Sequence, residues 1–129
     1  PHLDRWTEQR RKHAATYTRL LQEAVGDLIV TPKEVDGCYH VFHQYTIRVP
    51  KRDELQAFLK EQGVATMVYY PLPLHLQPVF APLGYKEGQL PEAEKAAKEV
   101  LSLPMFPELK EEQQQYVVEK IAEFYRRFA

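Results

Sequence analysis

Apolar residues return at steps of three and four along the first 25 residues, which predicts a long amphipathic helix over residues 4–25. Gly26 follows it and can supply the left-handed conformation that ends many helices. The first two turns hold only Leu3 and Trp6 as large apolar groups, so we expect that end of the helix to lack a neighbour within this chain. The apolar positions of the helix are Leu3, Trp6, Ala14, Tyr17, Leu20, Leu21, Ala24 and Val25.

From Tyr39 to Val49 apolar and polar residues alternate among strand-forming side chains, which predicts a β-strand over residues 39–49. Val41, His43, Tyr45, Ile47 and Val49 would share one face, with His40, Phe42, Gln44, Thr46 and Arg48 on the other. His43 then lies among core residues, and we interpret it as a buried, hydrogen-bonded histidine rather than a catalytic one. Nothing orients or activates the neighbouring Cys38, so we interpret it as an inert thiol.

The rest of the chain repeats both patterns around a proline-rich segment. The predicted elements are helices over residues 51–62, 91–100 and 110–128 and strands over residues 65–70 and 101–103. Because Pro104 would interrupt a central strand, we expect residues 101–103 at an edge of the sheet.

Residues 69–85, which we name the proline arm, contain four prolines within twelve residues: Pro71, Pro73, Pro78 and Pro82. Each proline lacks a backbone N–H and holds its predecessor extended, so the arm should be stiff and largely unpaired. It carries hydrogen-bonding groups on an otherwise apolar segment, at Tyr69, Tyr70, His75, Gln77 and Tyr85. This mixture is typical of a ligand-binding wall, and we expect side chains that point off the arm to contribute little to the fold.

Composition narrows the possible partners. The 129 residues suit one domain, and 17 basic against 18 acidic side chains give a net charge of -1, which argues against nucleic acid or an anionic membrane as partner. No apolar run is long enough for a membrane span, and the single cysteine excludes an intrachain disulfide, so we expect a cytoplasmic protein. His40 and His43 would face opposite sides of a strand, so no metal site is predicted. Pro1 stands where an initiator methionine would be, which suggests a cut inside a longer protein.

Five motifs follow one another along nearly the whole chain: Arg52-Asp53-Glu54-Leu55, the run from Tyr69 to Pro78, Leu83-Gly84-Tyr85, Pro91-x-Ala93-Glu94 and the run from Glu99 to Leu109. In this order they resemble the DegT/DnrJ/EryC1/StrS family of nucleotide-sugar aminotransferases. The resemblance implies an α/β (α+β) fold in which a small, mainly antiparallel three-stranded sheet packs with helices. It also implies that residues 1–27 link to a large domain outside this chain and that residues 28–129 form the carboxyl-terminal small domain of a fold-type I enzyme.

In that family the cofactor is pyridoxal phosphate, held as a Schiff base on a lysine in a Ser-Phe-x-x-x-Lys segment of the large domain. None of the nine lysines of this chain stands in such a context. The resemblance therefore implies an active parent enzyme, no catalytic or cofactor-binding residue in this chain, and no activity of the chain alone.

The family's small-domain tip often reads His-Tyr-Pro and contacts the nucleotide sugar. Here it reads Tyr69-Tyr70-Pro71. Tyr70 matches the family, Tyr69 replaces the commoner histidine, and His75 matches the family's Pro-Leu-His. The resemblance makes Tyr70, His75 and Tyr69 candidate substrate-binding residues.

The implied reaction moves an amino group from an amino acid to a keto-sugar nucleotide, and the implied parent is a homodimer. Two alternatives remain open at this point. Some relatives dehydrate the sugar and carry histidine in place of the lysine. The chain could also be a stand-alone module whose proline arm binds a protein partner through its polyproline conformation.

Overall fold

The computed structural model describes residues 1–128, and within them the chain forms four α-helices and two strands. The α-helices are α1 (Leu3–Val25), α2 (Arg52–Glu61), α3 (Pro91–Glu99) and α4 (Glu111–Arg127). The strands are β1 (Tyr45–Arg48) and β2 (Val100–Leu103), and the 3-10 helices are η1 (Gly26–Leu28), η2 (Leu74–Leu76) and η3 (Pro78–Leu83). All four predicted α-helices are confirmed, with ends that differ by no more than a residue or so.

The sheet in the described residues is a two-stranded antiparallel pair in which Tyr45 lies opposite Leu103 and Arg48 opposite Val100. Isolated bridges extend it on both sides, from Val30 to Arg48 and from Met67 to Ser102. The predicted class, a small antiparallel sheet packed with helices behind a long first helix, is confirmed. The third strand, predicted over residues 65–70, is reduced to the single bridge at Met67.

β2 lies at an edge of the two-stranded sheet, as predicted. A single bridge to Met67 covers its outer side at Ser102, through two backbone hydrogen bonds of 2.8 and 3.1 Å. Pro104 follows the last paired residue, so its missing N–H interrupts nothing.

The predicted strand over residues 39–49 is wrong for its first half. Phe42 has a positive φ of 47°, which L-residues other than glycine rarely adopt, and its N–H donates to Nδ1 of His40 at 2.9 Å. This turn ends the extended run and brings the Phe42 ring into the core beside Tyr45. Val41 and His43 consequently face solvent, so the interpretation of His43 as a buried core histidine is also wrong.

The core lies between the sheet and the paired helices α1 and α4. Tyr17 and Leu21 of α1 are fully buried, as are Tyr45 of β1 and Ile121 of α4. The Tyr17 and Tyr45 rings stack with centroids 5.1 Å apart. Burial raises the pKa of Tyr45 to about 12, so this phenol stays neutral in the core.

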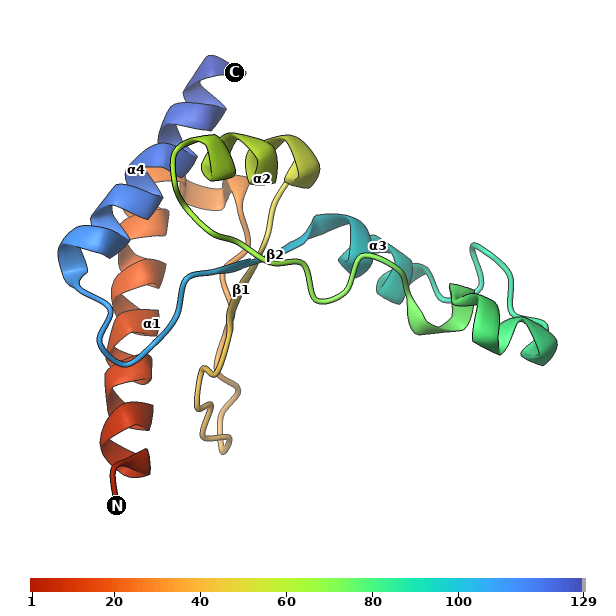
Figure 1. The fold of residues 1–129 in the computed structure, drawn as a ribbon, viewed down its shortest axis with the longest axis horizontal. Helices are drawn as coiled ribbons and strands as arrows, with labels where there is room; N and C mark the ends of the chain where they lie inside the picture. The colour runs from red at the N-terminus through yellow and green to blue at the C-terminus, as the bar shows by residue number, and fades with distance from the viewer. Residues whose placement is uncertain (129) are drawn as a thin grey trace.

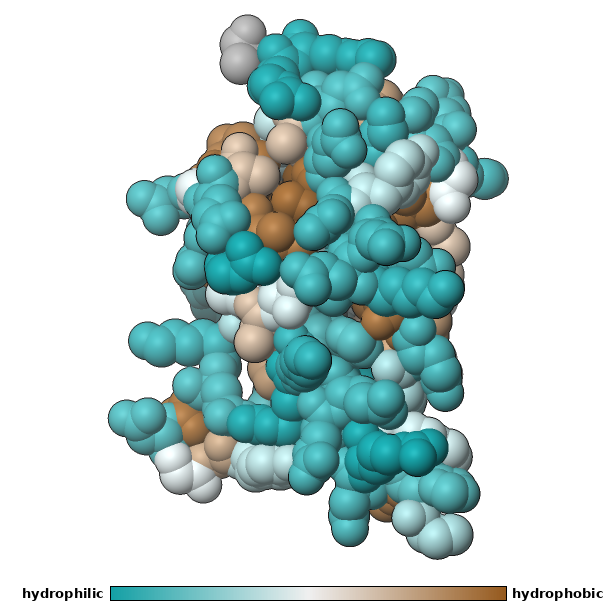
Figure 2. Space-filling view, turned by 90° about the vertical axis from the view of Figure 1, so that its left-hand side faces the viewer, coloured by the Kyte–Doolittle hydropathy of each residue, from teal (hydrophilic) through white to brown (hydrophobic). Residues whose placement is uncertain are grey.

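Figure 1 shows α1 and α4 side by side, α2 across one end of the sheet, and the proline arm with α3 extending away from the paired helices. Polar side chains cover most of the face that α4 turns outward, with apolar surface in small patches (Figure 2). Only the second half of α1 is buried in this core, since Leu3 and Trp6 stay 67% and 38% exposed. Residues 39–43 face that end of α1 across a cavity, so the expectation that it lacks a neighbour within this chain holds only for close packing. The domain boundary after residue 27 stays a prediction.

Candidate functional site

The chain leaves the sheet after Met67, and the proline arm that follows folds into η2 and η3 rather than a strand. From residue 68 to residue 99 no residue belongs to a strand, which agrees with the unpaired segment that its prolines predict. Leu74, Val79 and Leu83 are each at least 66% exposed. The arm therefore holds its shape without burying most of its apolar side chains.

His75 is the exception on this exposed arm. Its side chain is only 6% exposed, and its Nε2 donates to Oε1 of Glu94 on α3 at 2.8 Å. The ring also meets Tyr85 edge-on, with centroids 6.3 Å apart. The expectation that His75 points off the arm and adds little to the fold is wrong, because the turn of η2 directs its imidazole toward α3.

Glu94 receives further hydrogen bonds from the loop between η3 and α3. The backbone N–H of Gly88 lies 2.9 Å from both carboxylate oxygens. The hydrogen bond from His75, followed by that from Gly88, lowers the pKa of Glu94 below its usual value. The carboxylate is thus ionised at neutral pH and joins three segments of the chain.

Tyr69 and Tyr70 lie at the root of the arm, where the chain leaves the sheet. Their rings meet edge-on with centroids 5.7 Å apart, and the Tyr70 side chain is 71% exposed. Among the candidate residues the structure brings together only these two. His75 lies further along the arm, in the separate contact with Glu94.

A cavity of about 250 Å³ opens beside Tyr69, between the sheet and the segment after β2. His43 and Gln44 line it from the residues before β1, and Ser102 lines it from β2. The Ser102 hydroxyl is 2.7 Å from the Thr46 hydroxyl in the cross-strand pair. The cavity offers imidazole, amide and phenol groups to a small polar ligand.

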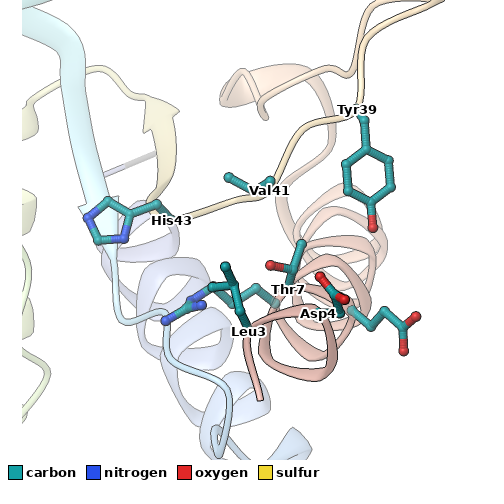
Figure 3. Close-up of a pocket in the computed structure, with 8 residues that line it drawn as sticks. Leu3, Asp4, Thr7, Tyr39, Val41 and His43 are labelled. Atoms are coloured by element: carbon teal, nitrogen blue, oxygen red, sulfur yellow. The ribbon is translucent and has the colours of Figure 1, made fainter. Parts of the chain in front are cut away.

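A larger cavity, of about 640 Å³, lies between the first half of α1 and residues 39–43 (Figure 3). In Figure 3, His43 and Val41 lie on the segment that runs above the helix, and Leu3 and Thr7 lie on the helix. His43 lines both cavities and so marks the wall between them.

Sequence reasoning missed two kinds of site residue. Gln44 and Ser102 were predicted only as strand residues. His43 was predicted as a core residue because the turn at Phe42 has no local signature in the sequence. Glu94 had a signal, since it stands in the motif Pro91-x-Ala93-Glu94. Its bond to His75, nineteen residues earlier, depends on the tertiary structure.

The exposure of its lysines bears on whether this chain could hold pyridoxal phosphate. Lys120 is half-buried and its Nζ lies 2.8 Å from Glu123, and the other eight lysines are exposed. A cofactor lysine needs an enclosed site. No lysine is fully buried within residues 1–128. Within residues 1–128 no helix is long and apolar enough to cross a membrane, and no three metal-ligating side chains cluster.

Comparison with known proteins agrees with the motifs. The profile of the DegT/DnrJ/EryC1/StrS aminotransferase family matches residues 1–122. A protein of Geobacillus stearothermophilus named "Pleiotropic regulatory protein" is 94% identical over all of this chain, which covers 35% of that protein. The UDP-N-acetyl-3-dehydro-alpha-D-glucosamine 3-aminotransferase of Acidithiobacillus ferrooxidans is 42% identical, over 98% of this chain and 32% of its own length.

Among solved structures, DesV of S. venezuelae in complex with a ketimine intermediate superimposes with a TM-score of 0.89 at 37% identity. The match covers 95% of this chain and 33% of DesV. The chain thus spans about a third of the length of the relatives it matches. With a profile match over nearly its whole length and the same fold as a solved relative, this chain belongs to the DegT/DnrJ/EryC1/StrS aminotransferase family.

Proposed function

We propose that this chain is the carboxyl-terminal small domain of a pyridoxal-phosphate-dependent aminotransferase that acts on a keto-sugar nucleotide. The observation that carries the proposal is the exposed pair Tyr69 and Tyr70 beside a polar cavity, in a family whose members include sugar-nucleotide transaminases by name. The parent enzyme takes its amino group from an amino acid. It works as a homodimer in the cytoplasm, with neither nucleic acid nor membrane as partner.

In this proposal Tyr69 and Tyr70, at the start of the proline arm, form part of the opening of the substrate-binding site. Tyr70 reaches the sugar nucleotide with its exposed phenol, and Tyr69 faces the ligand from the wall of the 250 Å³ cavity. His75 completes the candidate set. Because its Nε2 is bound to Glu94, a direct contact from His75 would use Nδ1.

Pyridoxal phosphate would supply the electron sink for amino transfer, and we assign its binding to the rest of the parent enzyme. The exposed lysines of this chain support that assignment. The 129 residues alone would therefore not transaminate. Their contribution is to bind and orient the sugar nucleotide.

A regulatory role is a second candidate, favoured by the name of the relative that is 94% identical. Regulation by binding to nucleic acid has no support from the charge of the chain, because a net charge of -1 gives it no overall attraction for nucleic acid. The aminotransferase proposal agrees better with the other relatives named above.

The direct test is turnover by the full-length protein. The protein, pyridoxal phosphate and glutamate would be incubated with UDP-linked and dTDP-linked keto sugars, and the products identified by mass spectrometry. A new amino-sugar nucleotide, with 2-oxoglutarate in equal amount, supports the proposal. No amino-sugar product from any of these substrates, with the cofactor bound, would contradict it.

A further inference from the structure

The proline arm and the residues after it hold their shape largely by themselves. In the part of the chain that the structure describes, the hydrogen bonds of residues 72–90 all run to partners within residues 73–94. Figure 1 shows the same segment extending away from the paired helices. The core around α1 and α4 therefore does little to order the arm, and the contacts inside residues 72–94 must do so.

One carboxylate connects the three parts of this segment. Glu94 on α3 accepts from His75 of η2 at 2.8 Å and from the N–H of Gly88 at 2.9 Å. The Glu94 side chain is 12% exposed and that of His75 is 6% exposed, so water competes little for these hydrogen bonds. The other hydrogen bonds of the segment are short-range turns such as Leu76 N–H to Pro73 O, at 3.0 Å.

The course of the proline arm affects the position of Tyr70 at its start. Tyr70 immediately precedes the first proline and is 71% exposed, so its position depends on the course of the backbone rather than on packing. An arm that moved freely would have to be ordered when a ligand binds, which weakens affinity. A fixed arm presents Tyr70 already in place.

We infer that Glu94 is a positioning residue, which locks the proline arm through His75 and Gly88 and thereby sets the affinity of the parent enzyme for its sugar nucleotide. This inference rests on the proposed function, in which the root of the arm contacts that ligand. It assigns Glu94 no contact with the substrate. Its effect is on the shape of residues 72–90.

Three variants of the full-length protein separate this role from a general loss of stability. Glu94→Ala removes every hydrogen bond of the carboxylate. Glu94→Gln keeps one oxygen, which can still accept from His75 and Gly88, but it turns an amide nitrogen toward the Gly88 N–H. Glu92→Ala, on the same helix and exposed, is the matched control.

Hydrogen–deuterium exchange measured by mass spectrometry reports how ordered the proline arm is, and it does not require enzymatic activity. We expect Glu94→Ala to speed exchange in peptides covering residues 72–90 by about tenfold, with residues 45–61 unchanged. Glu94→Gln should fall between wild type and Glu94→Ala, and Glu92→Ala should match wild type. Unchanged exchange of residues 72–90 in Glu94→Ala would overturn the inference, whatever the kinetics show.

Steady-state kinetics supply the second measurement. Glu94→Ala should raise the KM for the sugar nucleotide about three- to tenfold, while kcat and the KM for the amino donor stay within about twofold. Faster exchange with an unchanged KM for the sugar nucleotide would overturn the link between arm order and affinity. If the wild-type protein aminates no sugar nucleotide, the proposed function fails, and the exchange measurement still decides whether Glu94 locks the arm.

Discussion

Arg11 of α1 binds the carboxylate of Glu34 with both terminal nitrogens of its guanidinium group, and the Nη2 to Oε1 distance is 3.1 Å. The same carboxylate accepts the backbone N–H of His40 at 2.7 Å. The Arg11 guanidinium also lies over the Tyr39 ring, 4.1 Å from its centroid. Through this pair α1 holds the loop whose far end, residues 39–43, forms one wall of the larger cavity.

The Arg11 and Glu34 pair should make the loop sensitive to acid. The hydrogen bonds from Arg11 and from the His40 amide lower the pKa of Glu34 from 4.5 to about 2. A carboxylate with a lowered folded-state pKa stabilises the folded loop fully above pH 4.5, and this contribution is lost as the pH falls toward 2. We expect the amide signal of His40 in a ¹⁵N-resolved NMR titration to shift with a midpoint near pH 2.

Glu34→Gln is the control for that titration. Because the variant has no carboxylate at position 34, the His40 amide should show no such transition. A wild-type midpoint near pH 4.5 would mean that the pair does not hold the loop in solution.

Removing the Tyr17 hydroxyl should destabilise the fold. The ring is fully buried, and its hydroxyl donates to the carbonyl oxygen of Pro104 at 2.9 Å, so Tyr17→Phe leaves that carbonyl without this donor. We expect a loss of about 1–2 kcal/mol in the free energy of unfolding. Urea denaturation followed by circular dichroism would measure it. Tyr39→Phe is the matched control, since Tyr39 is 64% exposed, and an equal loss in both variants would contradict the argument.

Tyr70→Phe should affect substrate binding and leave stability unchanged. The side chain is 71% exposed, so its hydroxyl contributes little to the fold. A lost hydrogen bond to a bound ligand is worth about 0.5–1.5 kcal/mol, or roughly a two- to tenfold rise in the KM of the full-length enzyme for the sugar nucleotide. The melting temperature and the half-reaction with the amino donor should stay near wild type. Tyr116→Phe on α4 should leave the KM unchanged, and a KM for Tyr70→Phe equal to that of wild type would exclude Tyr70 from the binding surface.

The 129-residue polypeptide should not hold pyridoxal phosphate at a defined lysine. Its lysines are exposed or, at Lys120, bound to Glu123, so none has the enclosed site that stabilises an imine. After incubation with the cofactor and borohydride reduction, peptide mapping should find only weak labelling spread over several lysines. One stoichiometric adduct at a single lysine would refute the prediction.

Much of this architecture follows from local patterns. The three- and four-residue spacing of apolar side chains located α1, α2, α3 and α4, because a helix that buries one face needs that period along the chain. Prolines likewise predicted an unpaired arm after Tyr70, since each removes a donor that sheet pairing requires. The exposed position of Tyr70 agrees with that reasoning.

Contacts between distant segments decided the rest, and no local pattern contains them. The alternation of residues 39–49 is a good strand pattern, yet the turn at Phe42 puts its ring into the core and leaves His43 in solvent. On an arm whose prolines suggested outward-pointing side chains, His75 is buried because Glu94 of α3 lies within hydrogen-bond distance. Local patterns report which face a residue can present, whereas burial depends on what the chain brings against that face.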